Sequence, residues 1–448
     1  MKTLFDLAQK LDRKKISSHQ LVEHCLANID AEEGEGRNAF ISVYRERALA
    51  EAVAADVARR EGRHTSPFAG IPISIKDLFD VAGVVTTAGS HVLDDQPAAT
   101  HDAMIVQRLR SAGFIILGKT NMTEFAYSGL GINAHYGTPA SPFDRRTRRI
   151  PGGSSSGGAV SVSDNMSAAT IGTDTGGSTR IPAALCGIVG FKPTAERVPQ
   201  DGCIPLSPSL DSIGPMANTV TCCAILDTVM AGTNDIELTP YPQVGLRLGV
   251  LDGFAMEGLD PEVQSAYQSV LDRLGKRGVL TKTVNLPELE NYNAHNNKAC
   301  LVGGEALAWH RKHLQIRSDH YDPWVRDRIE ASQSFSAADY VEIVARRKAV
   351  QQATQKRCAG LDAIVLPTVP LIPMPIAELS QDPELAKTIN VMNLRNTSVA
   401  NTLNAPAITI PCHVPESPPV GFMLMGQPHE DRKLLSVALS LEPIIRRS

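Results

Sequence analysis

Residues 172–183 read Gly-Thr-Asp-Thr-Gly-Gly-Ser-Thr-Arg-Ile-Pro-Ala, and upstream residues 151–158 read Pro-Gly-Gly-Ser-Ser-Ser-Gly-Gly. Both stretches combine several glycines with hydroxyl side chains. Glycines in such a run let the backbone approach a ligand closely and direct several N–H groups at one point. This arrangement predicts a site that binds a phosphate or stabilises an oxyanion.

The spacing within these stretches does not support the phosphate alternative. Neither stretch ends in the Gly-Lys-Ser/Thr of a P-loop, and neither has the G-x-G-x-x-G pattern after a strand. Residues 153–157 match the G-x-S-x-G pattern of a nucleophile elbow, with Ser155 as the nucleophile. That turn needs a buried strand in front of it, whereas residues 145–149 contain four arginines, so we interpret the match as coincidental.

The sequence around the two stretches alternates between expected strands and short helices. Residues 70–77 are an apolar run that ends in charge, residues 102–110 have helical spacing, and residues 114–117 are apolar again. Strands that alternate with helices are typical of an α/β fold with a parallel or mixed sheet. We therefore expect a catalytic core over residues 68–250.

The rest of the chain divides into segments with different expected secondary structure. Residues 1–60 are expected to be helical, with a capping box at Ser17 and Gln20, and residues 258–358 are mostly helical. Residues 360–448 complete the core. Further strands are expected at residues 245–251, 361–366, 407–411 and 420–425, and a last helix at 432–445.

Four more segments carry a resemblance to a known family: residues 71–77 (Ile-Pro-Ile-Ser-Ile-Lys-Asp), 113–125, 186–194 and 209–215. Together with the two glycine-rich stretches, they resemble the amidase signature family of serine hydrolases. The resemblance is strong over residues 68–220 and nearly absent in the helical insertion. It implies one amidase signature domain over residues 1–448, an α/β fold with a mixed, largely parallel central sheet surrounded by helices.

The resemblance also implies a catalytic triad. Ser178 matches the nucleophile, Lys76 the general base, and Ser154 the bridging serine, whose preceding peptide bond is cis in the family. These residue types suit the chemistry, because a serine hydroxyl is a poor nucleophile until a neighbour takes its proton. A lysine can take that proton if burial keeps it neutral, and a bridging hydroxyl can relay it.

The same resemblance implies that the backbone N–H groups of Thr175, Gly176 and Gly177 form the oxyanion hole. Asp174 and Arg180 flank the nucleophile, and we expect them to pair and to fix the loop. Asp77 follows Lys76 directly and would keep the lysine charged if it lay nearby. Adjacent strand residues point to opposite faces of a sheet, so we expect Asp77 to lie away from the Lys76 amine.

Composition excludes several classes of function. A net charge of −4 gives no electrostatic reason to expect nucleic acid or a membrane surface as a partner. The eight cysteines lack metal-ligand spacing, and His310 and His313 are expected on an exposed helix face, so neither a metal nor a cofactor is predicted. Residues 1–13 lack the apolar core of a signal peptide, which predicts a soluble, cytoplasmic protein.

The sequence therefore predicts a free-standing amidase that hydrolyses a linear amide of a small molecule. The alternative is the glutaminase subunit of a tRNA-dependent amidotransferase, whose insertion carries a tyrosine-rich stretch. Residues 336–342 of this chain read Ser-Ala-Ala-Asp-Tyr-Val-Glu, which favours the free-standing enzyme. The identity of the amide, a role for Arg326 or Arg328 toward a substrate carboxylate, and assembly into a homodimer all stay open at this point.

Overall fold

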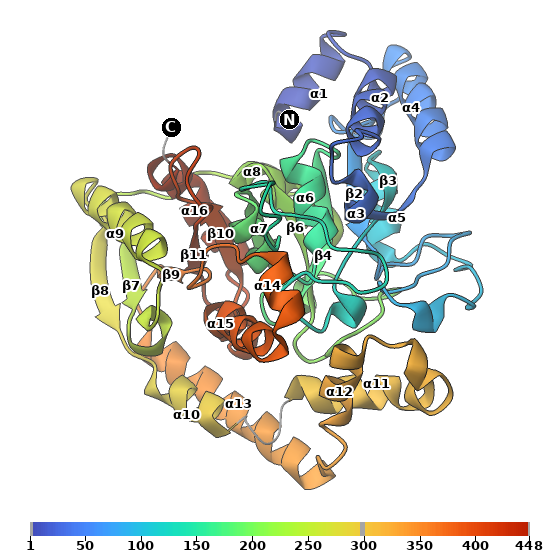
Figure 1. The fold of residues 1–448 in the computed structure, drawn as a ribbon. Coiled ribbons are helices and arrows are strands. Elements are labelled where there is room, and N and C mark those ends of the chain that lie inside the picture. The colour runs from blue at the N-terminus through green and yellow to red at the C-terminus, as the bar shows by residue number, and fades with distance from the viewer. Residues whose placement is uncertain (1–2, 296–300, 447–448) are drawn as a thin grey trace.

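The computed structural model describes residues 3–295 and 301–446, and an eleven-stranded mixed sheet runs through this part of the chain (Figure 1). Residues before 220 supply one half of the sheet, and residues after 245 supply the other half. From edge to edge the strands are β1 (Phe40–Val43), β3 (Ile115–Thr120), β2 (Pro72–Lys76), β4 (Ala169–Asp174), β6 (Ser212–Ala217), β5 (Val189–Lys192), β10 (Ala407–Pro411), β11 (Gly421–Met425), β9 (Ala363–Pro367), β7 (Arg247–Leu251) and β8 (Leu280–Val284).

The mixed α/β architecture expected from the sequence is confirmed. Parallel pairing occurs where β2 lies between β3 and β4, and where β7 lies between β8 and β9. The other neighbouring pairs are antiparallel. The parallel share of the sheet is therefore smaller than the expectation of a largely parallel sheet, because β4, β6, β5, β10, β11 and β9 follow one another in alternating directions.

Helices cover both faces of the sheet. They are α1 (Leu4–Asp12), α2 (Ser18–Ile29), α3 (Gly36–Ala39), α4 (Arg45–Arg60), α5 (Met104–Ser111), α6 (Ser156–Ser163), α7 (Arg180–Leu185), α8 (Val220–Ala231), α9 (Pro261–Lys276), α10 (Pro287–His295), α11 (Leu301–Arg317), α12 (Pro323–Glu330), α13 (Ala337–Arg357), α14 (Ile376–Gln381), α15 (Pro383–Thr402) and α16 (Asp431–Ile445). Helices α5, α8, α9 and α16 share one apolar core, and α6 packs on the opposite face.

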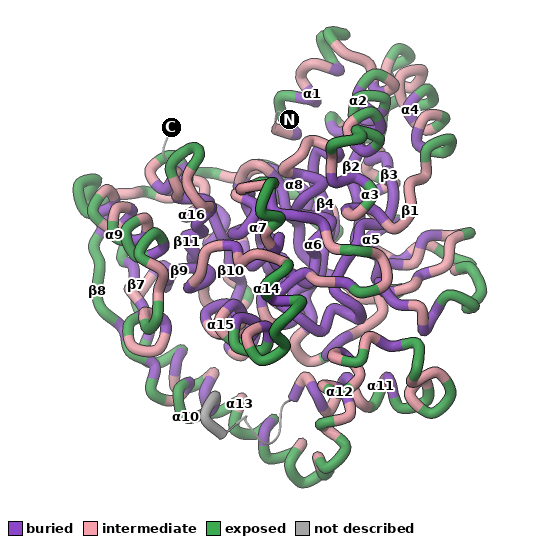
Figure 2. The backbone as a smooth tube through the Cα atoms, viewed as in Figure 1, coloured by how far each residue is buried: buried purple, intermediate pink, exposed green. Residues whose placement is uncertain are grey.

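Strand β2 shows how the sequence places the core and the site on different faces. Ile73 and Ile75 alternate with Ser74 and Lys76, and side chains two apart share a face of a strand. The two isoleucines join the apolar core with α5, α8 and α16. Ser74 lies on the other face, where its hydroxyl is 3.0 Å from that of Ser161 in α6. Figure 2 shows the strands in the middle of the sheet as buried, whereas the edge strand β8 is exposed.

Residues 258–358 are mostly helical, as expected, but they also contribute strand β8. This strand pairs with β7 at the edge of the sheet, and four of its five residues are exposed. An exposed edge strand lacks the apolar run by which buried strands are recognised in a sequence. Helices α10, α11, α12 and α13 of this segment form the lower rim of the molecule in Figure 1, whereas α9 lies beside β7 and β8.

The expectation that His310 lies on an exposed helix face is wrong. Its side chain is fully buried, its Nδ1 lies 2.8 Å from the Tyr321 hydroxyl, and its ring meets Phe125 edge to face at 4.4 Å. Burial lowers the pKa of His310 to about 3. The burial results from tertiary packing, because the face of α11 that carries His310 lies against the segment that carries Phe125.

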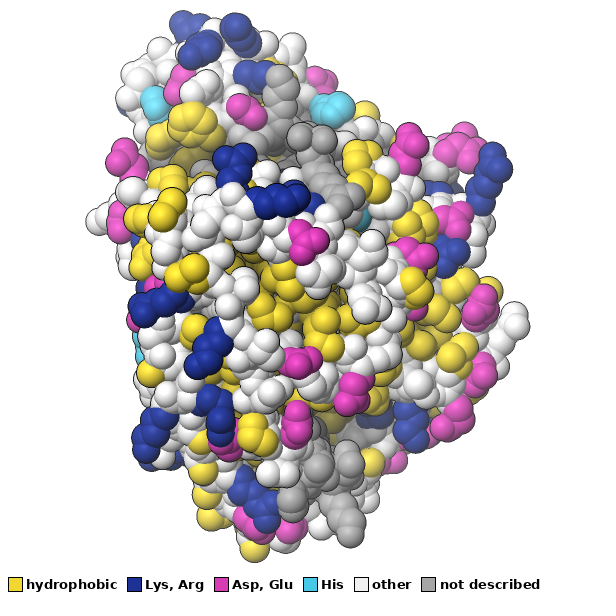
Figure 3. Space-filling model, turned by 90° about the vertical axis from the view of Figure 1, so that its left-hand side faces the viewer, with side chains coloured by type: hydrophobic (Ala, Val, Ile, Leu, Met, Phe, Trp, Pro, Cys, Tyr) yellow, Lys and Arg dark blue, Asp and Glu magenta, His cyan; other side chains and the backbone are white. Residues whose placement is uncertain are grey.

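Across the described chain, no helix combines the length and the apolar character that a membrane crossing needs. Basic and acidic side chains are both spread over the face seen in Figure 3, and hydrophobic side chains gather near its centre. The capping box expected at the start of α2 is confirmed, because Ser17 accepts from the Gln20 amide and Gln20 accepts from the Ser17 amide.

Candidate active site

Lys76 ends strand β2 in the interior of the sheet. Its side chain is fully buried, and its Nζ donates to the Ser154 hydroxyl at 2.7 Å and to the Thr173 hydroxyl at 2.9 Å. Burial lowers the pKa of Lys76 to about 7, against the opposing effect of Asp211 and Asp174. The amine is therefore available in its neutral form near neutral pH.

Asp77 lies away from this amine, as its position in the strand predicts. Its carboxylate pairs with the buried Lys119 amine at 3.3 Å and accepts from the Gly89 amide at 3.1 Å. The Thr87 hydroxyl also donates to it. These partners hold Asp77 on the Lys119 side of the sheet.

Ser154 lies in the loop before α6, and the peptide bond between Gly153 and Ser154 is cis. The Gly153 amide donates to the Gly129 carbonyl at 2.9 Å, and the Ser154 carbonyl accepts from the Thr123 amide at 3.0 Å. Both partners belong to the segment after β3. The loop is thus fixed on both sides of the serine whose hydroxyl meets Lys76.

Ser155 does not have the surroundings of a nucleophile elbow. It is fully buried, it is the residue that precedes α6, and its hydroxyl donates to the Thr173 carbonyl at 3.4 Å. A loop leads into this position, whereas a nucleophile elbow follows a strand.

Ser178 lies between β4 and α7, in a loop held by a buried ion pair. Arg180 donates to Asp174 through two nitrogens at 2.8 and 3.1 Å, and both side chains are fully buried. Although burial raises the pKa of Asp174, the Arg180 guanidinium outweighs it and leaves that pKa below its ordinary value. Asp174 also accepts from the Thr179 amide at 3.1 Å, which fixes the residue after Ser178.

The backbone between Asp174 and Ser178 presents amide groups next to the serine. Gly177 has a φ of 138°, a conformation that favours glycine. The amides of Gly176 and Gly177 donate no hydrogen bond to any other residue that the structure describes. The hydroxyl of Thr175 donates to Asp211, whose pKa burial raises to about 6.

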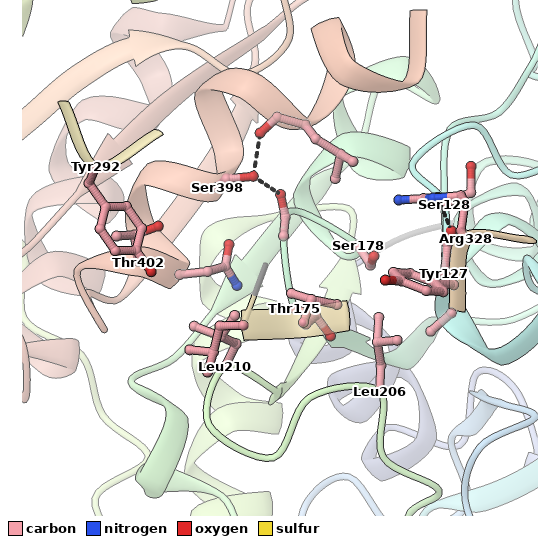
Figure 4. Close-up of a pocket in the computed structure, with 16 residues that line it drawn as sticks. Tyr127, Ser128, Thr175, Ser178, Leu206, Leu210, Tyr292, Arg328, Ser398 and Thr402 are labelled. Atoms are coloured by element: carbon pink, nitrogen blue, oxygen red, sulfur yellow. Dashed lines mark hydrogen bonds between the residues drawn. The ribbon is translucent and has the colours of Figure 1, made fainter. Parts of the chain in front are cut away.

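A cavity of about 250 Å³ opens beside Ser178 (Figure 4). Its lining is Ala126, Tyr127, Ser128, Thr175, Gly176, Ser178, Leu206, Leu210, Tyr292, Leu301, Val302, Arg328, Leu394, Ser398, Asn401 and Thr402. Of the residues named above, Ser178, Thr175 and Gly176 reach this lining, whereas Lys76 and Ser154 lie behind it. The cavity has the size of a small-molecule site with a mainly apolar wall.

Arg328 is the one charged side chain in the described lining of this cavity. Its guanidinium lies 4.4 Å from the centre of the Tyr127 ring and 5.3 Å from that of Trp324, and it donates to the Tyr127 carbonyl. Figure 4 places Arg328 and Tyr127 on the same side of the cavity as Ser128. Arg326, in contrast, pairs with its neighbour Asp327 at 3.0 Å.

Sequence reasoning missed helix α15. Its residues Asn390, Asn393, Thr397 and Asn401 are at most 4% exposed, and two of them contact the loop that carries Ser178. Polar residues that recur every three or four positions are typical of an exposed helix face. The signal that could have found them is the concentration of asparagine, a poor helix former, along one face.

Within the described ranges, His, Cys, Asp and Glu side chains form no cluster of three or more that could hold a metal ion. No disulfide joins the cysteines that the structure describes, and Cys222 and Cys223 are buried core residues, as expected.

The chain is similar to known proteins over nearly its whole length. The chain is 34% identical to the 2-amino-5-chloromuconic acid deaminase of Comamonas testosteroni, over 99% of this chain and 96% of that protein. It is 36% identical to a glutamyl-tRNA(Gln) amidotransferase subunit of Chloroflexus aggregans, over 94% of this chain and 92% of that protein.

Solved structures show the same fold. A crystal structure of an amidase superposes with a TM-score of 0.88 at 31% identity, covering 99% of this chain and 100% of that one. The peptide amidase of Stenotrophomonas maltophilia superposes with a TM-score of 0.84 at 27% identity, covering 100% of this chain and 98% of that one. The family model named Amidase matches residues 20–435. The chain therefore belongs to the amidase signature family, whose members hydrolyse carbon–nitrogen bonds.

Proposed function

We propose that this enzyme is a serine amidase that forms an acyl-enzyme on Ser178, with Ser154 as the proton relay and Lys76 as the general base. The observation that carries the proposal is the 2.7 Å hydrogen bond between Lys76 and Ser154, made by an amine whose pKa burial lowers to about 7. A base with a pKa near the working pH is suited to proton transfer.

The reaction follows from these roles. Neutral Lys76 takes a proton from Ser154 as Ser154 takes one from Ser178, and the Ser178 oxygen attacks the amide carbonyl. The backbone N–H groups of Thr175, Gly176 and Gly177 stabilise the negative charge on the carbonyl oxygen. One such donor lowers the activation free energy by about 3–4 kcal/mol. The proton then returns through Ser154 to the leaving nitrogen, and water hydrolyses the acyl-enzyme.

We further propose a small substrate that carries an acidic group. The cavity beside Ser178 measures about 250 Å³, and Arg328 is the charged side chain in its described lining. Arginine binds carboxylates through paired hydrogen bonds. The deaminase of Comamonas testosteroni is similar over the whole chain and acts, by its name, on an acid.

The alternative is a glutaminase subunit of a tRNA-dependent amidotransferase. The observation in its favour is the 36% identity to the amidotransferase subunit of Chloroflexus aggregans. Against it stands the first turn of α13, where residues 336–342 contain a single tyrosine. We therefore propose that the chain works without a second subunit or tRNA.

A screen of amides tests the proposal. Purified enzyme is incubated with primary amides, anilides and amino-acid amides, each with and without a carboxylate, and release of ammonia or amine is measured. We expect turnover of acidic amides, its loss in Ser178→Ala, and covalent labelling of Ser178 by a fluorophosphonate. The Ser155→Ala enzyme is the control and keeps the label. Label mapped to Ser155 contradicts the assignment of the nucleophile.

The same preparation separates the two functions. Turnover by the purified chain alone supports the free-standing amidase. The amidotransferase hypothesis is supported instead if the chain alone is inert and hydrolyses glutamine only when tRNA and a second subunit are added.

A further inference from the structure

The buried face of helix α15 is polar, which is unusual for a helix packed into a core. Asn390, Thr397 and Asn401 are 4%, 0% and 3% exposed. With 3.6 residues per turn, positions separated by seven and eleven residues lie on one stripe of a helix. We call these three residues the α15 stripe. Buried polar groups cost free energy unless they are hydrogen-bonded, so their partners decide what the stripe does.

Thr397 bonds to the loop that carries Ser178. Its hydroxyl donates to the Gly176 carbonyl at 2.6 Å. The neighbouring Ser398 hydroxyl lies 3.3 Å from the same carbonyl and 2.6 Å from the Leu394 carbonyl, to which it donates. A trans peptide is planar, and its C=O and N–H groups point in opposite directions. Within the described chain the cis bond is at Gly153–Ser154, so the Gly176–Gly177 peptide is trans. Holding the Gly176 carbonyl therefore fixes the direction of the Gly177 N–H.

Asn401 acts on the start of the same loop. Its amide nitrogen donates to the backbone carbonyl of Asp174 at 3.1 Å and to the Asp174 carboxylate at 2.9 Å. Its amide oxygen accepts from Arg180 at 2.8 Å. The Asp174 carbonyl also accepts from Ser212 at 3.0 Å. By the same peptide geometry, these bonds fix the direction of the Thr175 N–H.

Asn390 connects α15, through Ser128 and Gly129, to the second glycine-rich loop. Its side-chain oxygen accepts from the Gly129 amide at 2.8 Å and from the Ser128 hydroxyl at 3.0 Å. The Gly129 carbonyl in turn accepts from the Gly153 amide at 2.9 Å, next to Ser154. One helix face thus contacts the Ser178 loop directly and is connected to the Ser154 loop through Gly129.

We propose that Thr397 and Asn401 are positioning residues, which hold the peptide planes of residues 174–177 so that the Thr175 and Gly177 amides face the developing oxyanion. This inference rests on the proposed function, in which those amides stabilise the transition state. Preorganised donors of this kind act in the transition state and contribute little to binding of the substrate.

Variants at position 397 test the inference. Thr397→Val keeps the shape of the side chain and removes the hydroxyl, whereas Thr397→Ser keeps the hydroxyl. Since loss of one oxyanion donor costs about 10²- to 10³-fold in kcat, we expect a misaligned donor in the valine variant to lower kcat at least about tenfold. The serine variant should stay within about threefold of the parent enzyme, and KM should change little in either variant.

Two readouts separate positioning from a loss of structure. The acidic limb of the kcat/KM profile reports the base, so Thr397→Val should lower the plateau and leave the limb at the same pH. Labelling by a fluorophosphonate should slow in parallel with kcat, whatever the natural substrate. Thr354→Val in α13 is the matched control, because this threonine is 5% exposed and its hydroxyl has no partner among the described residues.

The outcomes are distinct. If Ser178→Ala retains turnover, the proposed function and the positioning role both fail. If Ser178 is required but the valine and serine variants have equal kcat, the positioning role is wrong and the proposed function stands. Should Thr397→Val not fold, Thr397→Ser and Thr397→Ala, which differ by one hydroxyl, decide by the same comparison.

Discussion

Lys76 and Lys192 are both fully buried, and burial lowers the pKa of each to about 7. Their surroundings differ. The Lys76 amine donates to the hydroxyls of Ser154 and Thr173, whereas the Lys192 amine donates to the backbone carbonyl of Pro193 at 2.8 Å. A lowered pKa is thus shared by a lysine at the candidate site and one outside it, and geometry distinguishes them.

This pair gives a prediction for pH dependence. If neutral Lys76 is the base, kcat/KM falls as pH drops below about 7, because protonation removes the acceptor. Lys76→Arg should lose nearly all activity, since arginine stays charged and cannot accept a proton. The measurement is a pH profile of kcat/KM, with Lys192→Met as the control that keeps the acidic limb. A Lys76→Arg enzyme with more than about a tenth of the parent activity would show that charge, and not proton transfer, is required.

Gly177 leaves no room for a larger residue. A methyl group at this position would lie 2.2 Å from the Thr397 hydroxyl and 2.7 Å from Ile181, and the φ of 138° is strained for other residues. We expect Gly177→Ala to displace the loop and to lower kcat at least about a hundredfold, the effect of losing an oxyanion donor. The control is Gly275→Ala in α9, where the added methyl meets no atom within 4 Å. Equal kcat in the two variants would contradict the expectation.

Among the contacts between helices and loops, hydrogen bonds to Glu305 connect α11 to the loop that lines the cavity. Its carboxylate accepts from the Ser207 hydroxyl at 2.6 Å, the Ser209 amide at 3.0 Å and the Tyr340 hydroxyl at 2.9 Å. Leu206 and Leu210 of that loop line the cavity. The helical insertion and the catalytic core therefore shape the cavity together.

Removing this carboxylate should affect binding more than chemistry. Hydrogen bonds to a charged group are each worth about 1.5–3 kcal/mol, so Glu305→Ala should loosen the loop and raise KM several-fold with kcat within about threefold. Steady-state kinetics measures both constants. Glu342→Ala, an exposed residue on α13 that pairs with Arg346, should change neither. A KM unaltered in Glu305→Ala would mean that the loop keeps its shape without α11.

The sequence predicts elements where burial leaves a pattern, and it misses those that depend on distant partners. Strand β2 is expected from the apolar run at residues 70–77 that ends in charge, and a fully buried strand that ends at Lys76 confirms it. Strand β8 lies on the exposed edge of the sheet, where no apolar alternation is needed. Helix α15 has buried asparagines whose partners lie more than 200 residues away, and no local pattern reveals such contacts.

For the molecule as a whole, the α/β fold follows from the alternation of strands and helices, and the family follows from the two glycine-rich stretches with the four further segments. The order of strands across the sheet could not be predicted. Strand β5 pairs with β10, which is more than 200 residues later in the chain. The number of residues between two strands does not indicate whether they pair in the sheet. The roles of Ser178, Ser154 and Lys76 likewise stay a prediction, for which the geometry supplies the support described above.

Buried lysines also affect stability as a function of pH. The pKa of Lys76 is lowered on folding from about 10.4 to about 7, so between these values the unfolded chain binds more protons. Stability attributable to this group therefore rises with pH from about 7 to 10. We expect Lys76→Met to melt at a higher temperature than the parent at pH 7, with a flatter dependence of Tm between pH 7 and 9. Calorimetry at several pH values checks this, and parallel curves for the two proteins would refute it.

The distance along the chain between α15 and the loop that it holds has a consequence for biosynthesis. Thr397 follows Gly176 by 221 residues, which a ribosome takes about 10–45 s to add. During that interval the nascent polypeptide already contains Lys76, Ser154 and Ser178. The helix that orients the loop does not yet exist, so on the positioning role proposed here hydrolysis begins only after α15 has been translated. A truncated product that ends before residue 383 would then be inert although every proposed triad residue is present.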